Sequence, residues 1–383
     1  MASFETATID DAGTQFAFID SGAPAAETYS TLVIVHGHTY HAQNFSRLLP
    51  IAKQHNLRVI ALNRRDYVGS TPYSESELAI INSNNNDAFP AFLQARGLEI
   101  ARFLVWVIKE KNIPRASSSA DGKEGGLAIL GWSLGNLTTM AFMRYLKSYP
   151  SEVVETIRPY LRTFYIYECG AGTLGYPSPE GGYHPLSDTT IPPRMRGIVF
   201  GNWVSSYYRH PYYSSPSSSN AKPDRTISSL RVHAPERDQV YRPSTLDSIP
   251  PADLMKCVDP VPPVRSEQPF MSTISRSIMY EQNLGVLLLD YTSQHPGGPK
   301  AQTTEEQDEA ILPDVKVRVI YGDASIWSIT WNTWELEKDL EKWRGKGRKI
   351  RDVHFLLVEG ANHFLHWDDP ELFLKTVKDG LVS

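Results

Sequence analysis

The sequence predicts an α/β fold in which a mostly parallel, doubly wound sheet is covered by helices on both faces. Two observations lead to this prediction. Short, β-branched and almost wholly apolar runs, such as 31–35 and 57–62, read as strands buried on both faces. Longer stretches between them, such as 89–111, show the apolar period of a helix. Strands that alternate with helices form parallel sheets through right-handed crossovers.

The first part of the chain begins with a hairpin signal, because two short strand-like segments flank Asp11-Ala12-Gly13. Pro114 follows the end of the long helical stretch, and a polar loop then leads to an apolar strand just before residue 131. The expected strands are 5–10, 14–19, 31–35, 57–62, 127–130 and 162–167, and the expected helices are 45–55, 89–111 and 136–146.

Regular alternation stops near residue 171 and resumes near residue 311. The stretch between is rich in Pro, Ser, Gly and Tyr and shows only short helical periods, such as 271–283. It also carries many aromatic side chains, which usually need burial, so an ordered insertion is favoured over a linker. We therefore expect a core of residues 1–170 and 311–383 with a cap inserted at 171–310. The expected elements of the last part are strands at 315–321 and 353–358 and helices at 331–344 and 370–381.

Bulk properties exclude several classes of protein. Hydrophobic residues make up 41% and charged residues 21% of the 383 residues, as in ordinary globular enzymes. The net charge of −5 without a basic tract argues against nucleic acid as a partner. The apolar runs are too short for stable membrane insertion, and the N-terminus lacks an apolar leader segment, so a cytoplasmic location is the expectation. The oligomeric state is left open.

The pentapeptide Gly131-Trp132-Ser133-Leu134-Gly135 lies between an expected strand and an expected helix. A serine on such a tight turn needs small residues on both sides, because a Cβ there would collide with neighbouring backbone. The turn pushes the hydroxyl out of the sheet. The next amide, at the start of the helix, then faces any negative charge that forms beside the serine. Ser133 is therefore the candidate nucleophile.

A serine becomes a good nucleophile only when a base removes its proton and a third group holds that base. His363 follows the last expected strand, where a loop can lean over the carboxyl edge of the sheet. It is the candidate base, whereas the neighbouring His366 is expected to pack or to cap the last helix. Two acids follow strands, Glu168 after 162–167 and Asp323 after 315–321, and both remain candidates on this ground.

Together these motifs resemble the α/β-hydrolase superfamily. The matching residues are His36-Gly37-His38, Arg65-Asp66-Tyr67-Val68-Gly69-Ser70, the turn at Ser133, Gly360-Ala361-Asn362-His363 and Trp367-Asp368-Asp369-Pro370. The resemblance covers about residues 1–170 and 310–383 and implies an α/β-hydrolase fold. It is specific for the fold and only weakly specific for the substrate.

The resemblance also bears on the choice of acid. In most members the acid sits three residues after the glycine that ends the penultimate strand, and this chain has Ser325 there. A minority, including some haloalkane dehalogenases and the fungal zearalenone lactone hydrolases, use a glutamate at the end of the strand after the serine turn. Glu168 is similar to that arrangement, so it is the preferred acid and Asp323 the alternative. A carboxylate at the end of an apolar strand also needs hydrogen-bond partners, which favours a role.

The resemblance implies an oxyanion hole made by the backbone amides of Leu134 and His38. Gly37 lets the backbone approach the substrate, and His36 is expected to form structural hydrogen bonds beneath the loop. His36, His38 and His41 are closely spaced, but the turn already accounts for the first two, so no metal is expected. No phosphate-binding glycine motif is present, and no cofactor is expected.

These features predict a serine hydrolase that cleaves an ester or lactone of a small hydrophobic molecule, with the cap walling the pocket. A serine at this turn argues against dehalogenase and epoxide hydrolase chemistry, for which members of the superfamily use aspartate. Two alternatives stay open. One is a hydrolase of carbon–carbon bonds that uses the same three residues, and the other is a ligand receptor without turnover.

Overall fold

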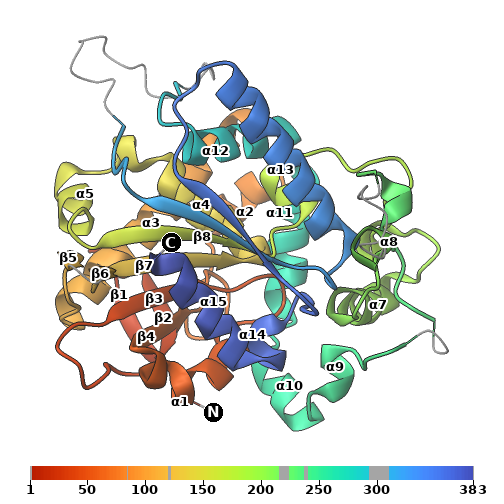
Figure 1. The fold of residues 1–383 in the computed structure, drawn as a ribbon, viewed down its shortest axis with the longest axis horizontal. Helices are drawn as coiled ribbons and strands as arrows, with labels where there is room; N and C mark the ends of the chain where they lie inside the picture. Colours follow the sequence, from red (N-terminus) through yellow and green to blue (C-terminus); the bar gives the residue numbers. More distant parts are fainter. Residues whose placement is uncertain are drawn as a thin grey trace.

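The computed structural model describes residues 2–83, 85–119, 122–214, 224–236, 240–292 and 310–382. An eight-stranded sheet has the order β1-β2-β4-β3-β7-β8-β9-β10 and crosses the middle of the molecule (Figure 1). Only the pairings of β2 with β1 and with β4 are antiparallel, and the remaining neighbours in the sheet are parallel. The strands are β1 Glu5–Thr8, β2 Gln15–Asp20, β3 Ser30–Val35, β4 Leu57–Leu62, β7 Leu127–Trp132, β8 Leu161–Tyr167, β9 Lys316–Gly322 and β10 Val353–Val358, with a separate hairpin of β5 Ser117–Ser119 and β6 Gly122–Glu124.

Each central strand is buried on both faces, as its apolar sequence predicts. In β3, Val33 and Val35 join the apolar cluster on one face of the sheet, while Leu32 and Ile34 join the cluster on the other. This division follows from the two-residue period of a strand, whose side chains point alternately to opposite faces. The predicted fold class, a doubly wound and mostly parallel sheet, is confirmed.

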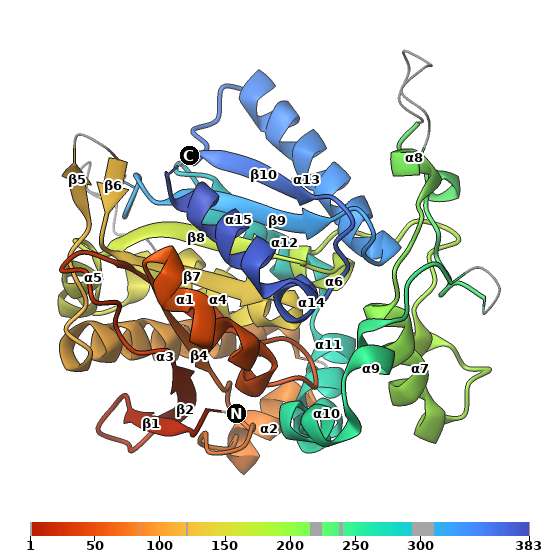
Figure 2. The same cartoon turned by 60° about the horizontal axis from the view of Figure 1, so that its bottom comes forward.

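Helices cover both faces of this sheet. Helices α3, α4 and α5 pack on the face that holds Val33, and α1, α14 and α15 pack on the opposite face (Figure 2). The helices are α1 Leu49–Ala52, α2 Glu75–Ile81, α3 Phe89–Glu110, α4 Asn136–Arg144, α5 Ser151–Ile157, α6 Ala171–Leu174, α7 Pro193–Ser205, α8 Pro211–Ser214, α9 Thr245–Ser248, α10 Pro251–Cys257, α11 Gln268–Thr273, α12 Arg276–Leu287, α13 Trp327–Gly345, α14 Leu365–Asp368 and α15 Pro370–Val382.

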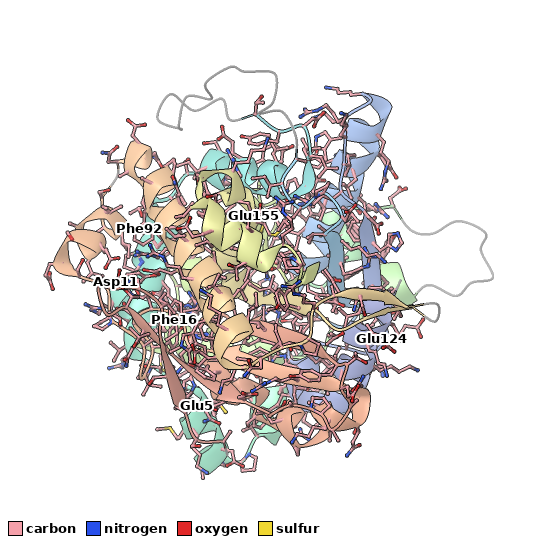
Figure 3. All side chains as sticks on the ribbon, turned by 90° about the vertical axis from the view of Figure 1, so that its left-hand side faces the viewer. Glu5, Asp11, Phe16, Phe92, Glu124 and Glu155 are labelled. Atoms are coloured by element: carbon pink, nitrogen blue, oxygen red, sulfur yellow. The ribbon has the colours of Figure 1, made fainter. Side chains whose placement is uncertain are left out.

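The side of the molecule near the first hairpin shows how the sheet is shielded. Figure 3 labels Glu5, Asp11 and Glu155 on this side, and all three are exposed. Phe16 on β2, by contrast, is 1% exposed and meets Phe103 of α3 edge to face, with ring centroids 5.8 Å apart. Aromatic contacts of this kind fix α3 against the sheet.

Two expected helices are interrupted in the structure. The stretch 45–55 is a series of short turns (3₁₀ turns at Ala42–Leu48 and Lys53–His55 around α1), and Pro50, which has no amide hydrogen, lies at its centre. The stretch 271–283 is divided between α11 and α12. Ile274 is extended there, and the Ser275 side chain accepts a hydrogen bond from the amide of Ile278 and so caps α12.

The segment between β8 and β9 contains α6 to α12. Helices α7 to α10 lie to one side of the sheet in Figure 2, whereas α12 packs against α4. Val286 and Leu287 of α12 belong to the same apolar cluster as α3, and the Arg351 guanidinium donates to the carbonyl of Val286 (2.9 Å). The end of this segment is therefore integrated into the core packing.

Candidate active site

The turn at Ser133 joins β7 to a short 3₁₀ turn, Ser133–Gly135, that leads into α4. Ser133 has a φ of 52°, which is unusual for a residue with a side chain and is a form of strain found at functional sites. A Cβ on Gly131 would lie 2.4 Å from Thr139 Oγ1, and one on Gly135 would lie 2.2 Å from the carbonyl oxygen of Val35. Only glycine fits at these positions. Ser133 is partly exposed while its neighbours Trp132 and Leu134 are buried.

His363 lies in the loop after β10, and its Nδ1 is 2.9 Å from Oε2 of Glu168 at the end of β8. Both residues are buried, with 3% and 1% exposure. The indole Nε1 of Trp132 donates to the carbonyl of His363 (3.0 Å), which holds the histidine loop next to the residue that precedes Ser133. Three segments far apart in sequence thus meet at the carboxyl edge of the sheet.

The Glu168 carboxylate has two further donors, both from the end of β9. Its Oε1 accepts from the amide of Gly322 (2.7 Å), and its Oε2 accepts from the hydroxyl of Ser325. Ser325 is fully buried. The residue at the position where the resemblance expects an acid therefore donates a hydrogen bond to a carboxylate that comes from the neighbouring strand.

Asp323, the alternative acid, has a different partner. Its Oδ1 accepts from the amide of Gly360 (2.6 Å), at the turn that begins the histidine loop. Burial raises the pKa of Asp323, and the Gly360 amide opposes that rise. The structure brings Glu168 to the His363 ring and joins Asp323 to the backbone of the loop.

The loop His36-Gly37-His38 lies against the serine turn. A Cβ on Gly37 would be 2.9 Å from the Cβ of Ser133, so the two backbones approach closely. Arg64 fixes the loop, because its Nε donates to the carbonyl of His36 (3.0 Å) and its Nη2 to the carbonyl of Gly37 (2.8 Å). The residues expected to supply oxyanion amides, His38 and Leu134, therefore flank Ser133 from two segments.

Comparisons with known proteins address the fold. No protein-family model matches the chain, and no curated protein matches its sequence. The structure of the ligand-free epoxide hydrolase CorEH superposes with a TM-score of 0.50 at 12% identity, covering 99% of this chain and 98% of that one. A bromoperoxidase from Bacillus anthracis (TM-score 0.47, 10% identity, 99% of both chains) is also similar. So is the esterase EaEST from Exiguobacterium antarcticum (0.45, 12%, 100% of this chain and 99% of that one).

The chain has the α/β-hydrolase fold. The strand order and the strained serine turn after β7 agree with this assignment. At 12% identity the likeness concerns the fold and not the substrate.

In this α/β-hydrolase fold, two buried histidines near the candidate site form hydrogen bonds that hold the surrounding segments in place. His36 accepts from the amide of Arg64 at Nε2 (3.0 Å), so its Nδ1 carries the proton and donates to the carbonyl of Gly37 (2.9 Å). His366 is bonded to Asn44 (2.8 Å) and to the hydroxyl of Tyr167 (3.1 Å). Burial lowers the pKa of both rings well below the ordinary value, so both are neutral at pH 7.

Sequence reasoning missed Glu267, which ends a five-residue π-helical turn at Pro263–Glu267 in the segment before α11. Its Oε1 accepts from Tyr67 (2.9 Å) and from Arg64, and its Oε2 lies 2.6 Å from Nδ1 of His38. Burial would raise the pKa of Glu267, but the charges of Arg64 and His38 outweigh it and lower the pKa to about 2. No local motif marks this glutamate, because its partners lie about 200 residues away.

The segment between β8 and β9 is tied to the histidine loop and to the loop after β9. Asn362 donates through Nδ2 to the carbonyl of Ser205 (2.7 Å), and the Asp368 carboxylate accepts from the hydroxyl of Tyr207. The amide of Tyr208 donates to the carbonyl of Ala324 (2.9 Å), and Nε2 of His210 is 2.8 Å from the carbonyl of Ser325. Residues 205–210 therefore contact both loops that carry the candidate site.

The described residues of the candidate site do not point to a metal. Within the described ranges, no cluster of three or more His, Cys, Asp or Glu side chains could hold a metal ion. The helices of those same ranges include none that is long and apolar enough to cross a membrane.

Proposed function

We propose that this chain is a serine hydrolase that cleaves an ester or lactone of a small hydrophobic molecule through an acyl-enzyme. The observation that carries the proposal is the buried pair of His363 and Glu168 beside a strained turn that leaves Ser133 partly exposed. The ring of Trp132, the residue before Ser133, lies 5.2 Å from the His363 ring between centroids, which brings the serine turn close to this pair. A serine near a histidine that is held by a carboxylate is the arrangement that activates a hydroxyl.

In the proposed reaction, Glu168 accepts a hydrogen bond from the Nδ1–H group of His363, so Nε2 is the basic atom. Ser133 Oγ attacks the substrate carbonyl carbon as its proton passes to Nε2. The amides of Leu134 and His38 donate to the oxyanion that forms. The carbon–oxygen bond to the alcohol then breaks, and the histidine returns the proton to the leaving oxygen. Water, deprotonated by His363, finally releases the acid and frees Ser133.

Glu168 rather than Asp323 is the acid in this proposal, because its oxygen is 2.9 Å from the His363 ring and Asp323 is bonded to the Gly360 amide. Residues 171–274 are proposed as the cap, which is shorter than the expected 171–310 because α12 packs with the core. Phe200 of α7 meets the His38 ring edge to face, with centroids 5.6 Å apart. An aromatic residue from the cap at the oxyanion loop supports a hydrophobic substrate.

The test is labelling with a fluorophosphonate probe, followed by mass spectrometry to locate the modified residue. We expect one modified site, Ser133, and no labelling in Ser133→Ala. His363→Ala should slow labelling by at least about 100-fold, since the base is lost. Both variants should unfold at temperatures close to that of the wild type. Labelling at another serine, or wild-type protein that neither reacts nor hydrolyses any ester in a panel, would overturn the proposal.

A further inference from the structure

A second pair of a glutamate and a histidine lies beside Ser133, formed by Glu267 and His38. We propose that the His38 imidazole binds a hydroxyl group of the substrate, in addition to the part played by its backbone amide. This inference rests on the proposed ester or lactone hydrolysis and narrows its substrates to those with a hydroxyl near the scissile carbonyl.

The proton on the His38 ring is located by Glu267. Oε2 of Glu267 lies 2.6 Å from His38 Nδ1, within ion-pair distance, and this oxygen has no hydrogen-bond partner among the described residues. The carboxylate is 5% exposed and shares its other oxygen with Arg64 and Tyr67. An ionised carboxylate only accepts hydrogen bonds, so Nδ1 must be the nitrogen that carries hydrogen.

The other ring nitrogen is therefore available to a ligand. Nε2 of His38 makes no hydrogen bond with any residue in the described part of the chain, and the side chain is 13% exposed. His38 follows Gly37 in the sequence, and the backbone of Gly37 is packed against Ser133. His38, whose amide is proposed to donate to the carbonyl oxygen of the substrate, thus also carries a ring nitrogen without a hydrogen-bond partner among the described residues.

The chemistry of the ring indicates which kind of group this nitrogen binds. Arg64 supplies a buried positive charge to the other oxygen of Glu267, with 7% of its side chain exposed. Without a hydrogen atom Nε2 accepts a hydrogen bond, and with one it donates a hydrogen bond. A hydroxyl on the acyl part of the substrate suits both cases, because it can donate and accept.

The experiment compares esters that differ only by one hydroxyl. Hydrolysis of methyl butanoate is measured against methyl 2-hydroxybutanoate and both enantiomers of methyl 3-hydroxybutanoate by titration of the released acid. We expect wild-type kcat/KM to favour one hydroxylated ester by about 3- to 10-fold, as one hydrogen bond allows. His38→Phe should abolish that ratio whatever its absolute rate, and His38→Gln should keep part of it, because its side-chain carbonyl still accepts.

A matched control is available on the surface. His55 Nε2 is 2.7 Å from Oε2 of Glu371, so His55→Phe breaks another histidine–glutamate pair on the outside of the molecule. That variant should keep the wild-type ratio. Glu267→Gln should lower the ratio, with thermal unfolding measured in parallel to show that the fold is intact.

Each outcome has one interpretation. If the wild type hydrolyses these esters without a preference, or if His38→Phe keeps the preference, the inference is overturned and the proposed hydrolase function stands. If fluorophosphonate does not label Ser133 and no ester is hydrolysed, the proposed function fails. Calorimetric titration of the same esters into Ser133→Ala then still measures whether a hydroxyl strengthens binding and whether His38→Phe removes that gain. Equal binding of all the esters overturns the inference.

Discussion

The Glu168 carboxylate accepts hydrogen bonds from three groups, the amide of Gly322, the hydroxyl of Ser325 and the ring of His363. Such bonds hold a buried carboxylate in one orientation and compensate for the water it has lost. The oxygen that contacts His363 is the one that Ser325 also contacts. Orientation of the histidine therefore depends on two neighbouring strands, β8 and β9.

The first prediction ranks the two candidate acids. Glu168→Gln should lower kcat for ester hydrolysis by about 100- to 10,000-fold, because an amide cannot hold the imidazole or stabilise its charged form in the same way. Asp323→Asn should change kcat by less than about 5-fold, since an amide oxygen can still accept from Gly360. Steady-state kinetics of both purified variants provide the measurement. The reverse order would show that Asp323 is the acid.

The contact between Ser325 and Glu168 leads to a second prediction. In Glu168→Gln, the added change Ser325→Asp supplies a carboxylate from the loop after β9, close to where the first was lost. We expect this double variant to recover at least about 10-fold of the lost kcat. Ser325→Asp alone should be slower than the wild type, because two carboxylates would then be forced together. A double variant no faster than Glu168→Gln would argue against the spatial equivalence of the two positions.

At this scale the sequence could indicate Ser133, His363 and Glu168, because each follows a strand that is recognisable by its apolar run. It could not indicate that Ser325 and Gly322 donate hydrogen bonds to Glu168, because these contacts depend on the register between β8 and β9. Glu267 was not predictable for a similar reason. Its partners His38 and Arg64 lie in a distant segment, and no pattern around Glu267 refers to them.

At the scale of elements, the serine turn depends on close packing between β7, α4 and β3. The backbone of Gly135 lies so near the carbonyl of Val35 that no side chain fits between them. This contact sets the distance from the start of α4 to the sheet. It also sets the position of the Leu134 amide, which is proposed to stabilise the oxyanion.

The third prediction uses this contact. Gly135→Ala would place a Cβ 2.2 Å from the carbonyl oxygen of Val35, so the backbone must shift. We expect a loss of about 2 kcal/mol or more in the free energy of unfolding and the loss of Ser133 labelling. Gly197→Ala is the control, because Gly197 lies in α7 with nothing within 4 Å. It should be neutral or stabilising by up to about 1 kcal/mol. Urea denaturation distinguishes these results, and equal effects would contradict the prediction.

The sequence predicted long, strongly periodic elements better than short ones. Helix α3 has the bounds Phe89–Glu110, against an expected 89–111, because its apolar face and the proline after it are both local signals. The helices expected at 45–55 and 271–283 were wrong in extent. Pro50 and the capping Ser275 interrupt them, and the apolar period alone did not reveal this.

At the scale of the whole molecule, several histidines are buried without charge. Burial lowers the pKa of His41 and His210 from 6.5 to about 4, and it lowers the pKa of His36 and His366 well below 6.5. Nδ1 of His210 accepts from the amide of Arg231 (2.8 Å), a bond that a protonated ring cannot make. The folded chain therefore resists the protonation that the unfolded chain undergoes freely.

The fourth prediction follows from the sign of these shifts. Below about pH 6.5 the unfolded state binds protons that the folded state excludes until about pH 4, so stability falls as the pH is lowered through this window. His41 and His210 should each contribute a loss on the order of 2 kcal/mol at pH 5. Urea midpoints measured between pH 7.5 and 5 should decline, and His210→Gln should flatten the decline. The exposed His354→Gln should leave the slope unchanged, and a midpoint independent of pH would refute the prediction.

The loop after β9 holds the Ser325 hydroxyl to Glu168 and, through the carbonyls of Ala324 and Ser325, also holds residues 208 and 210 of the segment above. A lifting movement of that segment must either break both backbone links or pull the loop with it. In the second case the serine oxygen withdraws from the carboxylate, and the histidine loses part of its support. The proposed reactivity of the Ser133 hydroxyl would then depend on residues 208 and 210 remaining bonded to the loop after β9.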